Sequence, residues 1–220
     1  MGYKLRIRFI KTGRARYISH LDLMATIQRA LLRTGIELSY SQGFNPHPYI
    51  SAALPLPVGC ASLCELLDFE SAYNLLPDGL PELITSALPE GIVVTEVYSP
   101  ARKFSDIAWL EICGELHYGS ESLPRAADRL TAIFSAESIV ILKKTKSGES
   151  NVDIAPFIRA AAFSRNGDVI EMRATVSAQN PTITPSNLLK AIAAADNAPV
   201  PDLATFTRRE LFDKTIERFF

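Results

Sequence analysis

The chain has 220 residues, of which 47% are hydrophobic, and its formal net charge at pH 7 is −1. This length suits one large or two small domains with a substantial buried core. No apolar run reaches the length of a membrane span, and Lys4, Arg6 and Arg8 interrupt the segment where a signal peptide would be hydrophobic. Three cysteines, an odd number, give no disulfide framework. We therefore expect a cytoplasmic protein that has no membrane partner.

The near-neutral total charge argues against a nucleic-acid partner, but the charge is unevenly distributed. Residues 1–50 carry eight lysines and arginines against two acidic residues, a net charge of +6. Residues 51–135 carry a net charge of −8, and residues 136–220 carry +1. Because the positive charge is concentrated in one segment, that segment has the charge pattern of an anion-binding surface.

The first half of the chain shows the pattern of one small α+β domain. Apolar residues alternate with Lys4, Arg6 and Arg8, which predicts a strand with one buried face and one cationic face. A helix follows, with Ser19 as its N-cap, Asp22 three residues later and Gly35 at its end. The next expected elements are an extended stretch over 38–54, a strand at 64–69, a helix at 81–88 and a strand at 92–98. The predicted order is βαββαβ.

The second half repeats this order after a joint at residues 99–105. We expect strands at 108–118, 139–143, 168–176 and 205–212, a helix reaching Phe134, and a second helix that begins at Thr184-Pro185. The predicted fold is therefore α+β, with two tandem ferredoxin-like domains that have antiparallel sheets, at residues 1–100 and 106–220.

Two motifs in the basic segment carry the candidate binding residues. Residues 14–22 read Arg-Ala-Arg-Tyr-Ile-Ser-His-Leu-Asp, and residues 40–48 read Tyr-Ser-Gln-Gly-Phe-Asn-Pro-His-Pro. The two prolines restrict Asn45 and His47, as suits a stiff recognition loop. The predicted RNA- or phosphate-binding residues are Arg6, Arg8, Arg14, Arg16, Ser19, His20, Tyr40, Gln42, Asn45, His47, Lys143, Lys144 and Lys146. The alternatives are a solvated strand face for the first arginines and a solubilising turn for the lysines.

The roles expected within this set follow from the residue types. The arginines would hold phosphates, the helix start at Ser19 and His20 would favour an anion, and the loop amides and His47 would contact a base edge or a sugar. Tyr40 and neighbouring aromatic residues would offer surfaces on which unpaired bases stack.

Catalysis and metal binding have weaker support in the sequence. His20, at a helix start, should favour its neutral form and could accept a proton, and His47 could act as a second acid or base, although nothing in the sequence fixes their separation. Cys60 and Cys64 begin the spacing of an iron–sulfur motif, but Leu67 stands where the third cysteine would be. We therefore expect no metal and no cofactor.

Several stretches together resemble the bacterial radical SAM-linked protein family. They are the two motifs at 14–22 and 40–48, the sequence Leu-Pro-Leu-Pro-Val-Gly at 54–59, residues 152–154 and Arg208. In that family the domain occurs alone, follows a radical SAM module or neighbours ribonuclease E/G. The resemblance implies work on RNA or ribosomes with one of these as a partner. Tyr49 departs from the family pattern, in which lysine or arginine is usual.

The leading hypothesis is a non-enzymatic RNA-binding accessory protein that acts with an RNA maturation or modification enzyme. One alternative is a metal-independent endoribonuclease that uses His20 and His47. Another is a docking module that binds a radical SAM partner through the loop at 40–48. Phosphate binding requires arginines that are exposed together, whereas a protein-docking site should expose apolar residues.

Overall fold

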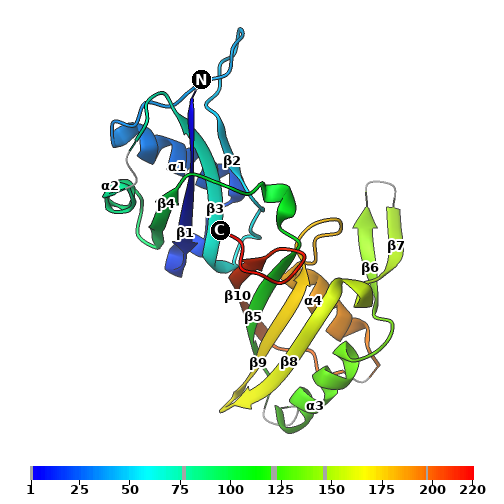
Figure 1. The fold of residues 1–220 in the computed structure, drawn as a ribbon. Helices are drawn as coiled ribbons and strands as arrows, with labels where there is room; N and C mark the ends of the chain where they lie inside the picture. The colour runs from blue at the N-terminus through cyan, green and yellow to red at the C-terminus, as the bar shows by residue number, and fades with distance from the viewer. Residues whose placement is uncertain (1, 76–77, 120–122, 146–147, 197) are drawn as a thin grey trace. The chain divides into compact units, whose positions relative to one another are not determined.

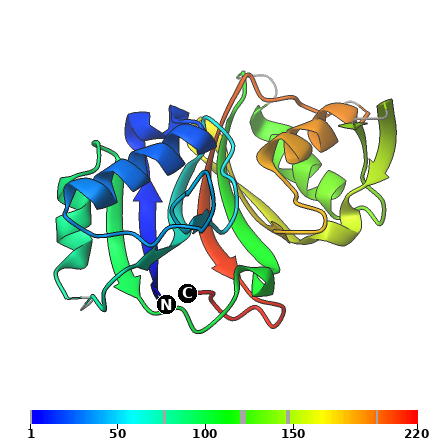
Figure 2. The ribbon, with the colours of Figure 1, turned by 90° about the horizontal axis from the view of Figure 1, so that it is seen from above.

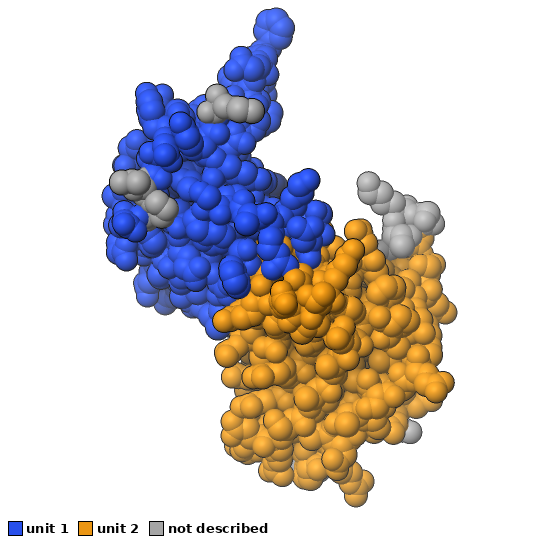
Figure 3. Space-filling model, viewed as in Figure 1, with its two compact units in different colours: residues 1–106, 220 blue, residues 107–219 orange. Residues whose placement is uncertain are grey.

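The computed structural model describes residues 2–75, 78–119, 123–145, 148–196 and 198–220. It divides into two compact units, which Figure 3 colours separately: unit 1 comprises residues 1–106 with residue 220, and unit 2 comprises residues 107–219. Both units combine helices with antiparallel strands, so the chain has a mixed α+β fold. Among the described residues, no helix is both long enough and apolar enough to span a membrane.

Unit 1 contains its strands and helices in the predicted order βαββαβ (Figure 1). The elements are β1 (Tyr3–Lys11), the short 3-10 helix η1 (Gly13–Tyr17), α1 (His20–Arg33), β2 (Ile50–Ala52), β3 (Ala61–Ser71), α2 (Leu80–Ser86), β4 (Ile92–Tyr98) and the 3-10 helix η2 (Phe104–Asp106). β1 lies between β4 and β3, and the three-residue β2 pairs with β3. All three pairings are antiparallel.

The core of unit 1 lies between this sheet and its helices, with α1 across one face of the sheet (Figure 2). It is built from alternate residues of β1 and one stripe of α1, which are Leu5, Ile7, Phe9, Leu23, Ile27 and Leu31. Ser19 caps α1, and Gly35, with a φ of +80°, follows its end, as the sequence predicts. The even-numbered residues of β1 therefore face away from the helices.

Unit 2 has an antiparallel sheet in the order β10-β5-β9-β8 and a separate two-stranded hairpin, β6-β7 (Figure 1). Its elements are β5 (Trp109–His117), α3 (Leu123–Phe134), β6 (Val140–Thr145), β7 (Gly148–Asp153), the 3-10 helix η3 (Ala155–Phe157), β8 (Ile158–Asn166), β9 (Val169–Ser177), α4 (Pro185–Ala194) and β10 (Leu203–Phe212). As predicted, Thr184 caps α4 and Pro185 opens it.

One strand assignment in unit 2 is wrong. The predicted strand at 139–143 exists, but it pairs with β7 in the hairpin and does not join the main sheet. The sheet strand in its place is β8, which the sequence did not reveal. β8 is rich in alanine and most of its residues are partly or fully exposed, so it lacks the alternation of large apolar residues that signals a strand.

Candidate nucleic-acid interface

Arg14 and Arg16 lie on η1, directly after β1, on a backbone that is fixed from two sides. Lys11 is 1% exposed, and its ammonium donates to the carbonyl oxygens of Ile18 at 2.8 Å and Arg16 at 3.3 Å. The N–H of Gly59 donates to the same Arg16 oxygen at 2.9 Å. Arg14 is exposed and Arg16 is partly exposed. Within the described residues, neither guanidinium has a hydrogen bond or an ion pair, so both can bind an anion.

The start of α1 is occupied by its own cap. The hydroxyl of Ser19 accepts from the backbone N–H of Asp22 at 3.2 Å and lies 2.7 Å from the Asp22 carboxylate, to which it donates. The carboxylate places negative charge where the helix dipole would favour a phosphate. His20, the first residue of α1, is partly exposed. The arginines of η1 are thus better placed for phosphate binding than the helix terminus.

The loop at 40–48 forms a hydrogen-bonded hairpin tip, as its two prolines suggest. The N–H of Ser41 donates to the carbonyl of His47 at 2.9 Å, and the His47 N–H donates to the Ser41 hydroxyl at 3.1 Å. The same hydroxyl lies 3.0 Å from the imidazole Nδ1. In Figures 1 and 3 this segment projects from unit 1. The side chains that were expected to contact RNA, Tyr40, Gln42, Asn45 and His47, are all exposed.

The loop exposes aromatic rings but carries no charge. Phe44 reaches 112% relative exposure, and Tyr40 and Tyr49 exceed 40%. Residues 38–64 contain no lysine, arginine, aspartate or glutamate. The loop can therefore stack on a base or enter an apolar pocket, but it offers no cation to a phosphate.

The two motifs lie at opposite ends of β1. Ser39 bonds to β3 at Glu70, beside the start of β1, whereas η1 follows the end of β1 at Lys11. A strand of this length spans roughly 30 Å, at about 3.3 Å per residue. α1 begins at His20 and runs from η1 back toward the loop. His20 and His47 are therefore separated by about the length of this 14-residue helix, roughly 20 Å. Unit 1 does not bring His20 and His47 together as an acid–base pair.

The expectation that Arg6 lies exposed on a cationic strand face is wrong. Its side chain is 0% exposed. Nε donates to one carboxylate oxygen of Asp68 at 2.6 Å, and Nη2 donates to the other at 3.1 Å and to the carbonyl of Arg102 at 2.9 Å. The ring of Phe104 covers the guanidinium at 4.2 Å. Arg6 is thus enclosed within unit 1. Arg8 is partly exposed, and its role as a phosphate ligand stays a prediction.

The lysine run lies in the β6-β7 hairpin of unit 2. Lys143 is partly exposed on β6, opposite Ser150. Lys144 also belongs to β6, whereas Lys146 lies outside the described residues. The predicted role of this run in RNA binding stays a prediction.

Cys60 and Cys64 are buried. Among the described residues, no three histidine, cysteine or acidic side chains form a group that could hold a metal ion.

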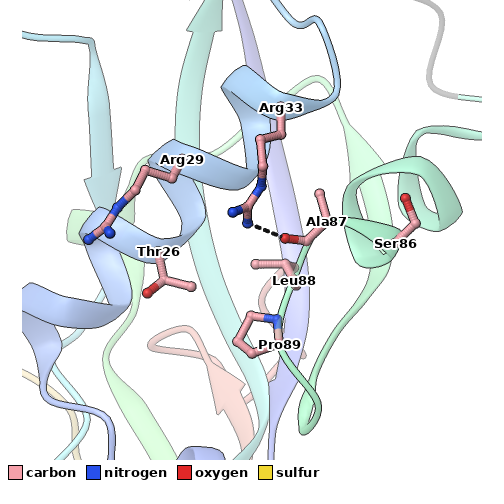
Figure 4. A pocket seen from close by; sticks show the side chains of 7 residues that line it. All are labelled: Thr26, Arg29, Arg33, Ser86, Ala87, Leu88 and Pro89. Atoms are coloured by element: carbon pink, nitrogen blue, oxygen red, sulfur yellow. Dashed lines mark hydrogen bonds between the residues drawn. The ribbon is translucent and has the colours of Figure 1, made fainter.

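Sequence reasoning missed two further arginines, Arg29 and Arg33, which line a groove on the helical side of unit 1 (Figure 4). This arginine groove has a volume of about 690 Å³ and is lined by Thr26, Arg29, Arg33, Ser86, Ala87, Leu88 and Pro89. Both arginines are exposed, and Arg33 donates from Nη2 to the carbonyl of Ala87 at 2.5 Å. Their i, i+4 spacing on a helix could have identified them as neighbours, but the opposite wall of the groove lies more than 50 residues later in sequence.

Comparisons with known proteins identify the family of the chain. Residues 4–185 match the model of a bacterial family described as "Uncharacterized protein conserved in bacteria", DUF2344. The chain belongs to this family. No curated protein matches it. The family description names neither a reaction nor a partner, so the function has to be argued from the residues.

Twenty-eight chains of solved structures match this chain. One is a chain of a Cbf5-Nop10-Gar1 complex, with 10% sequence identity and a TM-score of 0.53, and the match covers 94% of this chain and 48% of that one. The chain thus spans about half the length of that protein, and a likeness at this identity concerns the fold alone. Another is an unknown protein from Galdieria sulphuraria, with 11% sequence identity and a TM-score of 0.29, and that match covers 80% of this chain and 82% of that one.

Proposed function

We propose that this protein binds RNA through Arg14 and Arg16 of unit 1 and acts as an accessory to an RNA maturation or modification enzyme. The observation that carries the proposal is the state of these two side chains: they are accessible, they have no acid partner among the described residues, and Lys11 and Gly59 fix the backbone carbonyl of Arg16. Contacts between cationic side chains and phosphates supply most of the affinity of proteins for nucleic acid, and arginine is well suited to them.

The assignment of the fold rests on strand topology, and the assignment of the partner enzyme rests on the family resemblance. We infer that both units are ferredoxin-like domains, because β4-β1-β3 with β2 in unit 1 and β10-β5-β9-β8 in unit 2 follow the same antiparallel pattern, with the β6-β7 hairpin inserted in unit 2. The resemblance carried by the motifs at 14–22 and 40–48 supports a radical SAM protein or ribonuclease E/G as the partner enzyme. The charged residues near the start of the sequence and the odd number of cysteines support a cytoplasmic site of action.

RNA affinity measured over a series of salt concentrations tests this proposal. Replacing Arg14 and Arg16 together with alanine should weaken binding to all RNA sequences alike. It should also reduce the log–log salt slope by about 1.4, since each single-strand phosphate contact contributes about 0.7. The matched control replaces Arg125 and Arg165, two exposed arginines of unit 2, and should change neither quantity. If the variant and the control keep the affinity and slope of the wild type, these arginines do not bind phosphate.

A second candidate function is protein docking through the loop, which the exposed Phe44 and the absence of charge over residues 38–64 favour. A phenyl ring on a stiff, uncharged tip suits an apolar pocket on a partner protein. Phe44→Ala separates the two roles. If bases stack on this ring, RNA affinity should fall by about 1–3 kcal/mol without a change in salt slope. If the loop docks a protein, RNA affinity should stay constant while binding of the purified partner enzyme weakens.

A further inference from the structure

We propose that the arginine groove of unit 1 binds a nucleoside phosphate. The site is separate from η1 and was not among the residues expected from sequence. Figure 4 shows its two walls: α1 contributes Thr26, Arg29 and Arg33, and the last residue of α2 with the chain that follows it contributes residues 86–89. The α1 wall is cationic and the opposite wall is largely apolar, so the ligand should combine an anion with an apolar group.

The α1 wall suits a phosphate. The Nε of Arg29 donates to the carbonyl of Ala25 at 3.1 Å, and Nη2 of Arg33 donates to that of Ala87 at 2.5 Å. These carbonyls are uncharged, so both guanidinium groups keep their positive charge, and each has further N–H donors. The hydroxyl of Thr26 lies on the same wall. None of the described lining residues carries a carboxylate that would repel an anion.

The opposite wall suits an apolar, planar group. Leu88 and Pro89 line the groove there, beside the side chain of Ala87. The volume of about 690 Å³ lies within the range of small-molecule sites, roughly 300–1,000 Å³, and exceeds what a bare phosphate requires. A nucleoside phosphate supplies both parts, an anion for the arginines and a base for the apolar wall.

This ligand chemistry has two sources, a free nucleotide or one nucleotide of an RNA strand. The RNA source rests on the proposed function, whereas the free-nucleotide source does not. The two cases share the same contacts in the groove and differ only in whether neighbouring nucleotides add affinity, so one set of titrations separates them.

The experiment follows backbone amide signals of the full chain by NMR during titration with AMP, adenosine, inorganic phosphate and a four-nucleotide RNA. We expect AMP to shift the amide signals around Thr26, Arg29 and Leu88 and to bind more tightly than inorganic phosphate. We expect adenosine to produce no saturable shift. Tighter binding of the tetranucleotide than of AMP, judged from the amides around Thr26, Arg29 and Leu88, identifies an RNA strand as the source of the ligand in the groove. Equal binding of the two identifies a free nucleotide.

The variant for this test is Arg29→Gln with Arg33→Gln, which should weaken AMP binding at least about tenfold, because it removes charge-assisted hydrogen bonds. The matched control is Arg125→Gln with Arg129→Gln on α3. That pair has the same i, i+4 spacing, and Arg129 likewise donates to a backbone carbonyl, that of Asp196 at 2.5 Å. The control should bind AMP like the wild type.

Three results would overturn the inference: no amide shift with AMP, inorganic phosphate binding as tightly as AMP, or an equal loss of AMP binding in the control variant. Failure here is distinguishable from failure of the proposed function. The salt slope of RNA binding depends on Arg14 and Arg16, and AMP binding to the groove is measured without RNA.

Discussion

Replacement of Arg6 by methionine tests whether this residue stabilises the fold or binds RNA. Its guanidinium holds both carboxylate oxygens of Asp68, at 2.6 and 3.1 Å, and the carbonyl of Arg102 at 2.9 Å. The change leaves the Asp68 carboxylate, which is 3% exposed, without its buried partner. Removal of one member of a buried ion pair typically costs about 3–5 kcal/mol of unfolding free energy. Lys4 still reaches Asp68 at 3.0 Å, so we expect a loss near the lower limit, about 3 kcal/mol.

Urea unfolding of three further variants isolates the pair. Lys4→Met removes a half-exposed partner of the same carboxylate and should cost less than about 1 kcal/mol. Asp68→Asn should cost as much as Arg6→Met, because it leaves a buried guanidinium. Replacing both residues, with Arg6→Met and Asp68→Leu, should recover part of the loss. If Arg6→Met costs less than about 1 kcal/mol and weakens RNA binding, the structural role argued for Arg6 is refuted.

Three further predictions concern single side chains. His47→Asn and His20→Ala should leave any RNA-cleaving activity of the metal-free protein unchanged on end-labelled RNA, because unit 1 does not bring the two histidines together. Discrete cuts that only the wild type makes would contradict this. Ser19→Ala should lower the unfolding free energy by about 1 kcal/mol in urea, since it removes the cap of α1, and full stability of the variant would argue against the cap. Backbone N–H groups donate to Asp153, chiefly that of Ile139, and lower the pKa of its carboxyl. Because folding favours the ionised carboxylate of Asp153, this group stabilises the fold at pH values above the pKa that its carboxyl has in the unfolded chain. The stabilisation is lost as the pH falls through the lower pKa that the carboxyl has in the folded chain. Thermal unfolding of Asp153→Ala should therefore differ from that of the wild type at about pH 7 and converge with it in acid.

The local signals of the sequence predicted unit 1 well. Three features each depend on residues only a few positions apart in sequence: the alternation along β1, the cap at Ser19 and the glycine after α1. The structure confirms all three. The strand β8 was missed because an alanine-rich, largely exposed strand carries little periodic signal. The hairpin was misassigned for a related reason, since the apolar character of residues 139–143 does not reveal which strand they pair with.

The candidate site was harder to predict than the fold, because its geometry depends on contacts between distant residues. Asp68 is 62 positions from Arg6, and nothing near Arg6 in sequence indicates the pair. The two motifs are likewise close in sequence, yet helix α1, which lies between them, keeps them apart. Whether two motifs meet depends on where the intervening elements run, which neither motif encodes.

The fate of individual cations explains why the charge of residues 1–50 was an incomplete guide to the binding surface. Lys4 and Arg6 share the carboxylate of Asp68, and Lys11 is buried against backbone carbonyls, so these three side chains are engaged within unit 1 and are poorly placed to bind an external phosphate. The positive charge that remains accessible includes Arg14 and Arg16 on η1 and the two arginines of the groove on α1. All four lie on η1 and α1, whereas Arg6 of the predicted strand face is enclosed, so we expect an anion to contact unit 1 mainly along η1 and α1.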